Sequence, residues 1–233
     1  MHEPLLGLFK LGKREHIEQF ARGLLYMNTL EHFVKVERNE ARHDPDEGIT
    51  YLKQAQGALL QVRVREKFED VGTIQGAIRW SHEEHLAANV FCMLAIRTAD
   101  ATASFPVDPR NFHFGDTFAV VLNGDDFIRR VHEAAIKTSH EFRSGVVEYV
   151  DMATYEGPMG ILKKSIAFSY QREFRMALLP GTGKPHVLEI GDISDNVFIG
   201  PVAELNERLR FVRGETLPPP TPESRSPFGH PSA

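Results

Sequence analysis

Residues 90–96 read VFCMLAI, an unbroken run of apolar side chains that decides the fold class. A short run of this kind is typical of a strand that is covered on both faces of a sheet. Two further apolar stretches, TFAVVL at 117–122 and FRMALL at 174–179, predict strands as well. The chain is therefore expected to build its core around a buried sheet.

Segments with helical spacing lie between these strands. Ile17 and Phe20 fall on one face of a predicted helix over 13–21, and Phe127 and Val131 fall on one face of a helix that begins at Asp125. Further strands are predicted at 5–11, 24–27, 58–64, 145–150 and 187–190, and further helices at 30–36 and 202–209. With about nine strands and about five helices, and with strands often adjacent in sequence, we predict an α+β fold with a mixed, largely antiparallel sheet.

The boundary of the folded part is predicted near Gly214. Residues 214–233 contain six prolines and almost no apolar side chains, a composition that cannot bury enough surface to form a core. We find no repeat and no linker before that point. The sequence thus predicts one domain over 1–213 and a disordered, proline-rich tail over 214–233.

Composition excludes some classes of function. The 233 residues carry a net charge of −5 with acidic and basic residues interspersed, so there is no strong signal for nucleic-acid binding. No apolar run approaches the roughly 20 residues that cross a bilayer, and the first residues do not resemble a signal peptide. The single cysteine, Cys92, fits a reducing compartment. We expect a cytoplasmic protein that does not act on membranes.

Two polar clusters are the candidate sites. In the first, Asp44-Pro45 begins a turn and Gly48 ends it, which brings Arg42, Asp44 and Glu47 together. Two acids beside an arginine bind a hydroxylated ligand or a cation, or form an ion-pair network; solvated surface charge is the competing interpretation.

The second cluster is Gln171, Glu173 and Arg175. The alternation of a strand places these three side chains on one face, with Phe174 and Met176 on the other. Such a row is costly to bury unless its groups pair or meet a ligand. An exposed row with a cross-strand ion pair is the alternative to a site.

No metal site is expected. His82 and His85 are three residues apart without a recognisable third ligand, and they do not form the HExxH pattern of zinc proteases. Cys92 lies inside the apolar strand and is assigned to the core.

Several stretches resemble a bacterial family of uncharacterised domains. They are GLLYMNTLEHF, the Arg42-x-Asp44-x-x-Glu47-Gly48 loop, FGDTFAVVLNGDDFIRRV, GVVEYVD and KKSIAFSYQREFRMAL, and together they span most of residues 8 to 200. The resemblance covers the whole predicted domain and implies no particular activity.

A weaker resemblance is to ADP-ribosyltransferases, which hold NAD on an early strand-helix-strand unit and carry a late Gln/Glu-x-Glu motif. Gln171-x-Glu173 is similar to that motif, and the resemblance implies that the Glu173 carboxylate stabilises a cation-like ribose. It implies binding roles for Tyr26 and Thr29, with NAD as the candidate cofactor. Lys10 stands where the family has Arg or His, and the Ser-Thr-Ser signature is absent.

Two hypotheses about function follow. In the first, the protein is an enzyme acting on a nucleotide such as NAD, with Glu173 catalytic, with Gln171, Tyr26, Thr29 and Arg42 in binding roles, and with Glu173 and Tyr26 lining one cleft. In the second, it is a non-catalytic protein-interaction module, of the kind that acts in conflict between bacteria and phages, and Asp44, Glu47 and Arg175 belong to an ion-pair network. The sequence leaves the ligand or protein partner open.

Overall fold

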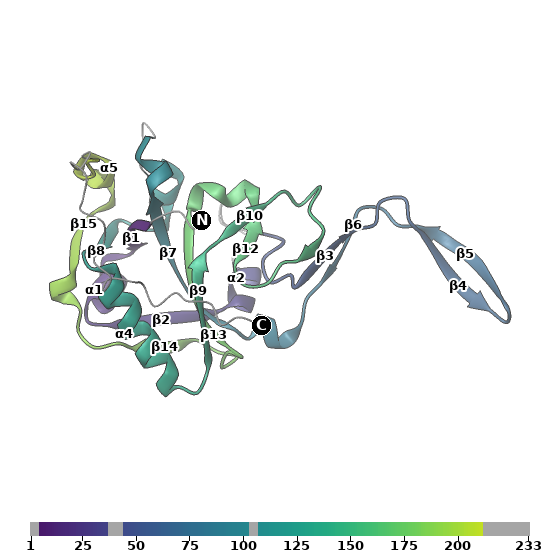
Figure 1. Ribbon diagram of the computed structural model, residues 1–233, viewed down its shortest axis with the longest axis horizontal. Helices are drawn as coiled ribbons and strands as arrows, with labels where there is room; N and C mark the ends of the chain where they lie inside the picture. The colour runs from purple at the N-terminus through teal and green to yellow at the C-terminus, as the bar shows by residue number, and fades with distance from the viewer. Residues whose placement is uncertain (1–4, 37–43, 103–106, 212–233) are drawn as a thin grey trace, which may run out of the picture.

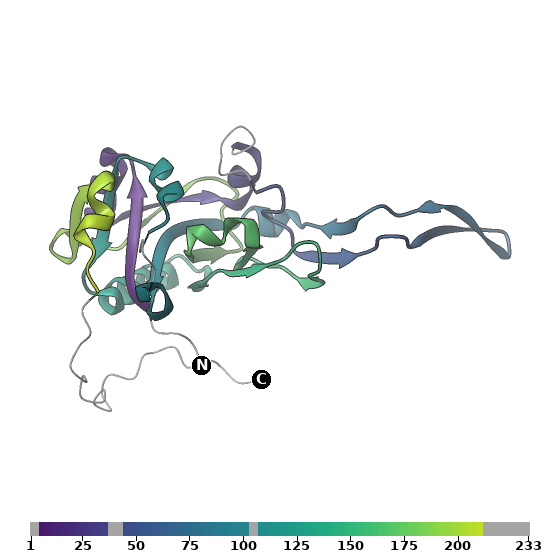
Figure 2. The same ribbon diagram turned by 90° about the horizontal axis from the view of Figure 1, so that it is seen from above.

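The computed structural model describes residues 5–36, 44–102 and 107–211. The α+β prediction is confirmed: an eight-stranded antiparallel sheet carries helices on its faces, and one long hairpin projects from it (Figures 1 and 2). The segment 214–233, predicted to be a disordered tail, lies outside the described residues.

The strands of the large sheet pair in the order β14-β2-β7-β1-β8-β15, and β13 and β9 extend it from the other edge of β7. Their bounds are β1 Leu5–Gly12, β2 Leu24–Thr29, β7 Asn89–Arg97, β8 Thr117–Val121, β9 Glu141–Val146, β13 Glu173–Leu179, β14 His186–Glu189 and β15 Val197–Pro201. The apolar run at 90–96 forms most of β7, which pairs with β13 along one edge and with β1 and β2 along the other. The prediction of a doubly covered strand is confirmed.

Helices cover the sheet unevenly. One face packs against the two longest helices, α1 and α4, through the buried Phe20, Phe127 and Val131. The opposite face is covered by shorter segments, among them Leu30 of α2 and Leu205 of α5. The α-helices are α1 Arg14–Ala21, α2 Leu30–Val36, α3 Glu83–Leu86, α4 Gly124–Lys137 and α5 Leu205–Arg208; the 3-10 helices are η2 Thr98–Thr102, η3 Pro109–Phe114, η4 Ile166–Gln171, η5 Ser194–Asn196 and η6 Val202–Glu204.

The strand predicted at 145–150 is two strands. Residues up to Val146 belong to β9 and pair with β13, whereas β10 (Glu148–Val150) pairs in parallel with β12 (Lys163–Ser165). The chain divides at Val147, whose N–H donates to the Glu173 carbonyl over 2.8 Å. The alternating segment GVVEYV does form strands, but its two halves pair with different strands.

The projecting hairpin, which we call the arm, spans residues 51–80. Its root is formed by β3 (Tyr51–Gln54) and β6 (Ala77–Trp80), to which the short β11 (Gly157–Pro158) adds a third strand. Its outer hairpin is formed by β4 (Leu59–Val64) and β5 (Lys67–Thr73). Every residue from 56 to 73 is exposed, so the outer hairpin has contacts only with itself within the described part of the chain (Figure 1).

Candidate functional site

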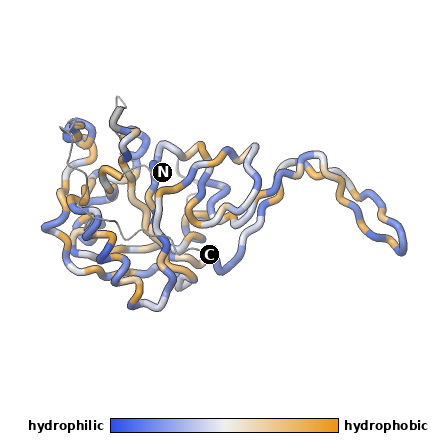
Figure 3. Tube along the Cα trace, viewed as in Figure 1, coloured by the Kyte–Doolittle hydropathy of each residue, from blue (hydrophilic) through white to orange (hydrophobic). Residues whose placement is uncertain are grey.

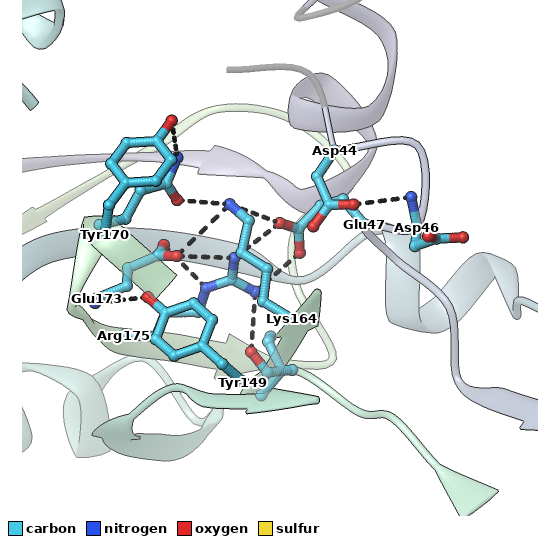
Figure 4. Close-up of polar contacts among 10 residues, drawn as sticks. Asp44, Asp46, Glu47, Tyr149, Lys164, Tyr170, Glu173 and Arg175 are labelled. Atoms are coloured by element: carbon cyan, nitrogen blue, oxygen red, sulfur yellow. Dashed lines mark hydrogen bonds and ion pairs between the residues drawn. The ribbon is translucent and has the colours of Figure 1, made fainter. Parts of the chain in front are cut away.

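The two predicted polar clusters meet at one place beneath the sheet. Glu47, from the turn before β3, pairs with Arg175 on β13, which also binds Glu173 on the same strand; Lys164 of β12 and Gln171 of η4 complete the cluster (Figure 4). We call these five residues the charge network. Each of them is buried, with between 2% and 8% of its surface exposed.

Arg175 is the centre of the charge network. Its Nη1 and Nη2 donate to the two carboxylate oxygens of Glu47 over 2.8 and 2.7 Å. Its Nε and Nη2 donate to Glu173 over 3.0 and 3.2 Å, and Nη1 also donates to the carbonyl of Ile161 over 3.0 Å. These contacts occupy all five N–H groups of the guanidinium. The two parallel hydrogen bonds to Glu47 form a bidentate pair, a geometry that lysine cannot reproduce.

Lys164 supplies the second positive charge. Its Nζ donates to Gln171 Oε1 over 2.9 Å and lies 3.3 Å from Glu47 Oε2 and 3.6 Å from Glu173 Oε2. The two carboxylates are therefore matched by two cations. A buried ion is tolerated when its charge is paired and its remaining hydrogen-bonding positions are filled, and both conditions are met here.

The charges hold one another in the ionised state. Burial by itself raises the pKa of the Glu47 and Glu173 carboxyls, but Arg175 and Lys164 outweigh it and bring the pKa of both below its ordinary value. For Lys164, burial lowers the pKa, and the two carboxylates more than reverse this. The network thus keeps four full charges over the ordinary range of pH.

The local sequence explains only part of this arrangement. Glu173 and Arg175 alternate along β13 as predicted, with Phe174 and Met176 in the core on the opposite face. Gln171 is not on that strand, because η4 ends there and Arg172 turns the backbone with a φ of 43°. The Gln171 side chain reaches the charge network from the 3-10 helix. The interpretation of the row as solvent-exposed is wrong, since both faces of β13 are covered.

Asp44 lies beside the charge network without joining it. Its Oδ1 accepts from the Asp46 N–H over 2.9 Å, while its Oδ2 is buried and finds no hydrogen-bond partner among the described residues. Burial raises the pKa of this carboxyl to about 6. Asp44 is 1% exposed, so it is a buried acid that ionises near neutral pH without a direct ion pair in the described part of the chain.

The other predicted binding residues lie elsewhere. Tyr26 is 54% exposed on β2, and no hydrogen bond within the described residues joins it to the charge network. Thr29 is buried, and its Oγ1 accepts from the N–H of His32 at the start of α2, a capping role. Arg42 lies outside the described residues.

Two members of the site were not predicted. Lys164 falls in the KKSIAFSYQREFRMAL stretch and Tyr149 in the GVVEYVD strand, but no role in a site was predicted for either residue. The Tyr149 hydroxyl accepts from the N–H of Glu173 over 2.9 Å, and burial raises the pKa of its phenol. Charge balance was the available signal for Lys164, because two buried acids and one arginine need a further cation.

The charge network connects directly to the arm. Glu47 lies in the turn at 44–48, only a few residues before β3, and its neighbour Asp46 pairs with Arg79 of β6 over 2.7 Å. The root also has its own apolar contacts, in which Leu52 and Ile49 are buried against Met159. Arg175 therefore ties the turn that leads into the arm to the central sheet.

A separate surface groove lies between α5 and the strands β8 and β15. Phe118, Phe198 and Leu205 are among its lining residues, and its volume is about 360 Å³. Of the predicted site residues that the structure describes, none lines this groove.

Among the described residues, no helix has the length and apolar character needed to cross a membrane, and no group of three or more His, Cys, Asp or Glu side chains is placed to hold a metal ion. In comparisons with protein-family models, with curated proteins and with solved structures, no match to this chain was found.

Proposed function

We propose that this chain is a protein-interaction module whose binding element is the arm. The observation that carries the proposal is the exposure of the outer hairpin. Leu60, Val62, Phe68 and Val71 each expose between 49% and 64% of their surface, and Val64 exposes 43%. Apolar side chains gathered on one projecting element are characteristic of a surface that is covered by another molecule.

The shape of the arm supports this role. A two-stranded hairpin is only marginally stable in water by itself, and packing against another molecule would stabilise it. Hydrophobic and hydrophilic residues alternate along it, so apolar side chains are presented to a partner while the hairpin remains soluble (Figure 3).

The charge network has a mechanical part in this proposal. Glu47 and Asp46 lie in the turn that leads into β3; Glu47 pairs with Arg175 of β13, and Asp46 pairs with Arg79 of β6. A binding element held at its base loses less conformational entropy when it meets a partner. The buried charges then serve to fix the direction of the arm, and Glu173 is a structural counterion rather than a reacting group.

Removal of the outer hairpin tests the proposal. The N–H of Ile74 donates to the carbonyl of Ala58 over 2.8 Å, and the same bond would close a two-residue turn placed between them. Residues 59–73 can therefore be replaced by Asn-Gly without disturbing the root. Intact and shortened proteins are immobilised and exposed to lysate of the native host, and bound proteins are quantified against the bait.

We expect the intact chain to retain one partner in stoichiometric amount, a second copy of itself included, and the shortened chain to lose it. Equal retention by both proteins, or no stoichiometric partner for either, would refute an arm-centred interaction. Circular dichroism and the thermal unfolding midpoint of the shortened chain show that it has folded.

An NAD-dependent enzyme is the second candidate, and one observation favours it. Asp44 Oδ2, which has no hydrogen-bond partner among the described residues, lies beside the charge network, where a ligand that donates a hydrogen bond would satisfy it. In this reading Glu173 acts at the ribose and Gln171 and Arg42 bind the nucleotide. Incubation with NAD would release nicotinamide, and Glu173→Gln would abolish the release while the exposed Glu133→Gln would not. A folded protein that neither binds nor cleaves NAD eliminates this candidate.

A further inference from the structure

The groove between α5 and the strands β8 and β15 has an apolar floor. Phe9 of β1, Phe118 of β8 and Leu205 of α5 belong to one apolar cluster there, and each exposes 3% or less of its surface. The groove volume of about 360 Å³ is at the lower end of the range for sites that enclose a small molecule. The groove therefore takes a few residues of extended chain rather than a folded partner.

The rim of the groove is aromatic as well. Phe198 of β15 exposes 42% of its surface, and its ring centroid lies 6.0 Å from that of Phe118. The guanidinium carbon of Arg208 lies 5.6 Å from the centroid of the Phe198 ring, and Arg208 Nε donates to the Glu204 carboxylate over 2.7 Å. Aromatic-lined grooves of this kind are the surfaces on which proline-rich segments dock.

The polarity of the lining narrows the class of ligand. Six of the seven lining residues are apolar, and the seventh, Arg208, is already paired with Glu204. A polar small molecule would therefore find few groups to orient it, because such sites combine an apolar lining with several placed polar groups. A short apolar segment of chain suits this lining better.

The chain leads from the groove into a proline-rich segment. Leu209 also lines the groove, and the described residues end two positions later, at Phe211. Residues 217–222 then read LPPPTP. Eight residues, 210–217, separate Leu209 from Pro218, and at about 3.3 Å per residue they reach roughly 26 Å, which is enough for the chain to return to the groove.

The order of residues in 217–222 suits an aromatic groove. Consecutive prolines favour a polyproline II helix, in which residues three positions apart lie along one edge because each turn contains three residues. One edge then carries Leu217 and Pro220, and the next carries Pro219 and Pro222; Thr221 lies on the third. Two of the three edges are therefore apolar and gain from contact with phenylalanine rings.

We propose that residues 217–222 of this chain bind in the groove lined by Phe118, Phe198 and Leu205. The inference is independent of the arm and of its partner. A short tether gives a binding segment an effective concentration on the order of millimolar, so a contact too weak to hold a separate peptide is still made within one chain. Because proline has a fixed φ, this segment also loses little conformational entropy when it binds.

Photo-crosslinking from the rim of the groove tests this contact in the full chain. The analogue p-benzoylphenylalanine is placed at position 198, because Phe198 lines the groove and is partly exposed. The control carries the same analogue at position 68, because Phe68 is exposed on the outer hairpin, away from the groove. Mass spectrometry of an equimolar mixture of isotopically labelled and unlabelled chains separates crosslinks within one chain from crosslinks between two.

We expect position 198 to crosslink to residues 217–222 of the same chain, with a yield at least about tenfold above that of position 68. Crosslinking of residues 217–222 to position 198 no more often than to position 68 would show that this segment does not occupy the groove. Crosslinks found only between labelled and unlabelled chains would show that the segment of a second copy occupies it, which overturns binding within one chain.

Substitutions in the full chain test the part played by the prolines. Pro219→Ser/Pro220→Ser/Pro222→Ser should lower the yield from position 198 by about fivefold or more, because serine neither fixes φ nor packs on aromatic rings. The matched control, Pro227→Ser/Pro231→Ser, alters prolines outside the segment and should change the yield by less than about twofold. An equal yield from both variants would overturn recognition of residues 217–222 through their prolines. The thermal unfolding midpoint shows that each variant is folded.

Discussion

The charge network and the outer hairpin distribute their side chains in opposite ways. The network buries four charged residues beneath a sheet, while the outer hairpin exposes six large apolar residues to solvent. Burying a single charge costs free energy, and so does exposing a single apolar side chain to water. In the network the compensation is internal, since each charge has partners within the chain. For the outer hairpin no such partner lies within the described residues, and a second molecule would have to cover its apolar side chains.

The largest expected effect comes from breaking the network at its centre. Arg175→Met leaves the Glu47 and Glu173 carboxylates buried with one cation, and we expect a loss of about 3–5 kcal/mol in the free energy of unfolding. Urea denaturation followed by circular dichroism measures it. The exposed Arg129→Met, which removes ion pairs to Asp126 and Glu133, is the control and should cost less than about 1 kcal/mol.

A loss for Arg175→Met no greater than the control would show that the network contributes little to stability. In that case the contrast between the two regions would lose its energetic basis.

The next effect depends on pH. The pKa of Asp44 is raised from 3.8 to about 6 in the folded protein, so its contribution to stability is full below pH 3.8 and is lost as pH rises through 6. Asp44→Asn removes the ionisation and should therefore stabilise the protein above neutrality. The free energy of unfolding of Asp44→Asn, relative to that of wild type, is expected to increase by up to roughly 3 kcal/mol between acid and alkaline solution.

Denaturation of wild type and Asp44→Asn across this pH range checks the sign. A difference between the two proteins that is the same at both ends of the range would contradict the raised pKa. Glu47 and Glu173 work in the opposite sense, because their lowered pKa values stabilise the fold above their ordinary range, and that stability is lost only as pH falls through the folded values.

A smaller and more local effect is expected from Glu47→Gln. This change weakens the hydrogen bonds between Arg175 and the turn that leads into the arm, and it leaves the β13–β7 pairing in place. The free energy of unfolding is expected to fall by about 1–3 kcal/mol. Hydrogen exchange should accelerate at β3 and β6 more than at β7. Glu66→Gln at the arm tip is the matched control, and uniform acceleration over the whole sheet would show that the network does not act on the root.

The smallest effect is predicted for removal of the outer hairpin. Replacement of residues 59–73 by Asn-Gly should change the free energy of unfolding by less than about 1 kcal/mol, because these residues contribute no buried side chain. A large loss in urea denaturation of the isolated protein would mean that the arm supports the domain rather than a partner.

Local patterns predicted much of the sheet and failed where pairing is distant. The apolar run in β7 and the alternation of Glu173 and Arg175 were readable because burial and period are properties of neighbouring residues. β5, with the sequence KFEDVGT, was not predicted, since its charges and glycine show no apolar period and it becomes a strand by pairing with β4. Residues 181–184 join β13 and β14, which pair with different strands, and no local pattern specifies those partners.

The site was predicted as two clusters and could not be predicted as one. Glu47 and Arg175 are 128 positions apart, and nothing local to either residue specifies the other. The alternatives of a ligand site and an ion-pair network were both stated for these residues, and the geometry places Asp44, Glu47, Gln171, Glu173 and Arg175 together with Lys164. Tyr26 and Thr29 had been assigned by resemblance alone, and their positions follow from β2 and the cap of α2 instead.

The pairing of β7 has a consequence for the order in which the chain folds. Its two edges are completed by β1 and β2, which the ribosome makes first, and by β13, which emerges only after another 80 or so residues, as the pairing of Cys92 with Arg175 shows. One edge of β7 therefore remains unpaired during synthesis until β13 has emerged. Contacts between residues so far apart in the sequence form slowly. Within the described residues the outer hairpin pairs only with itself, so it can close long before the sheet does. Nascent chains stopped on either side of β13 would differ in resistance to proteolysis in the sheet, with the hairpin already formed in both.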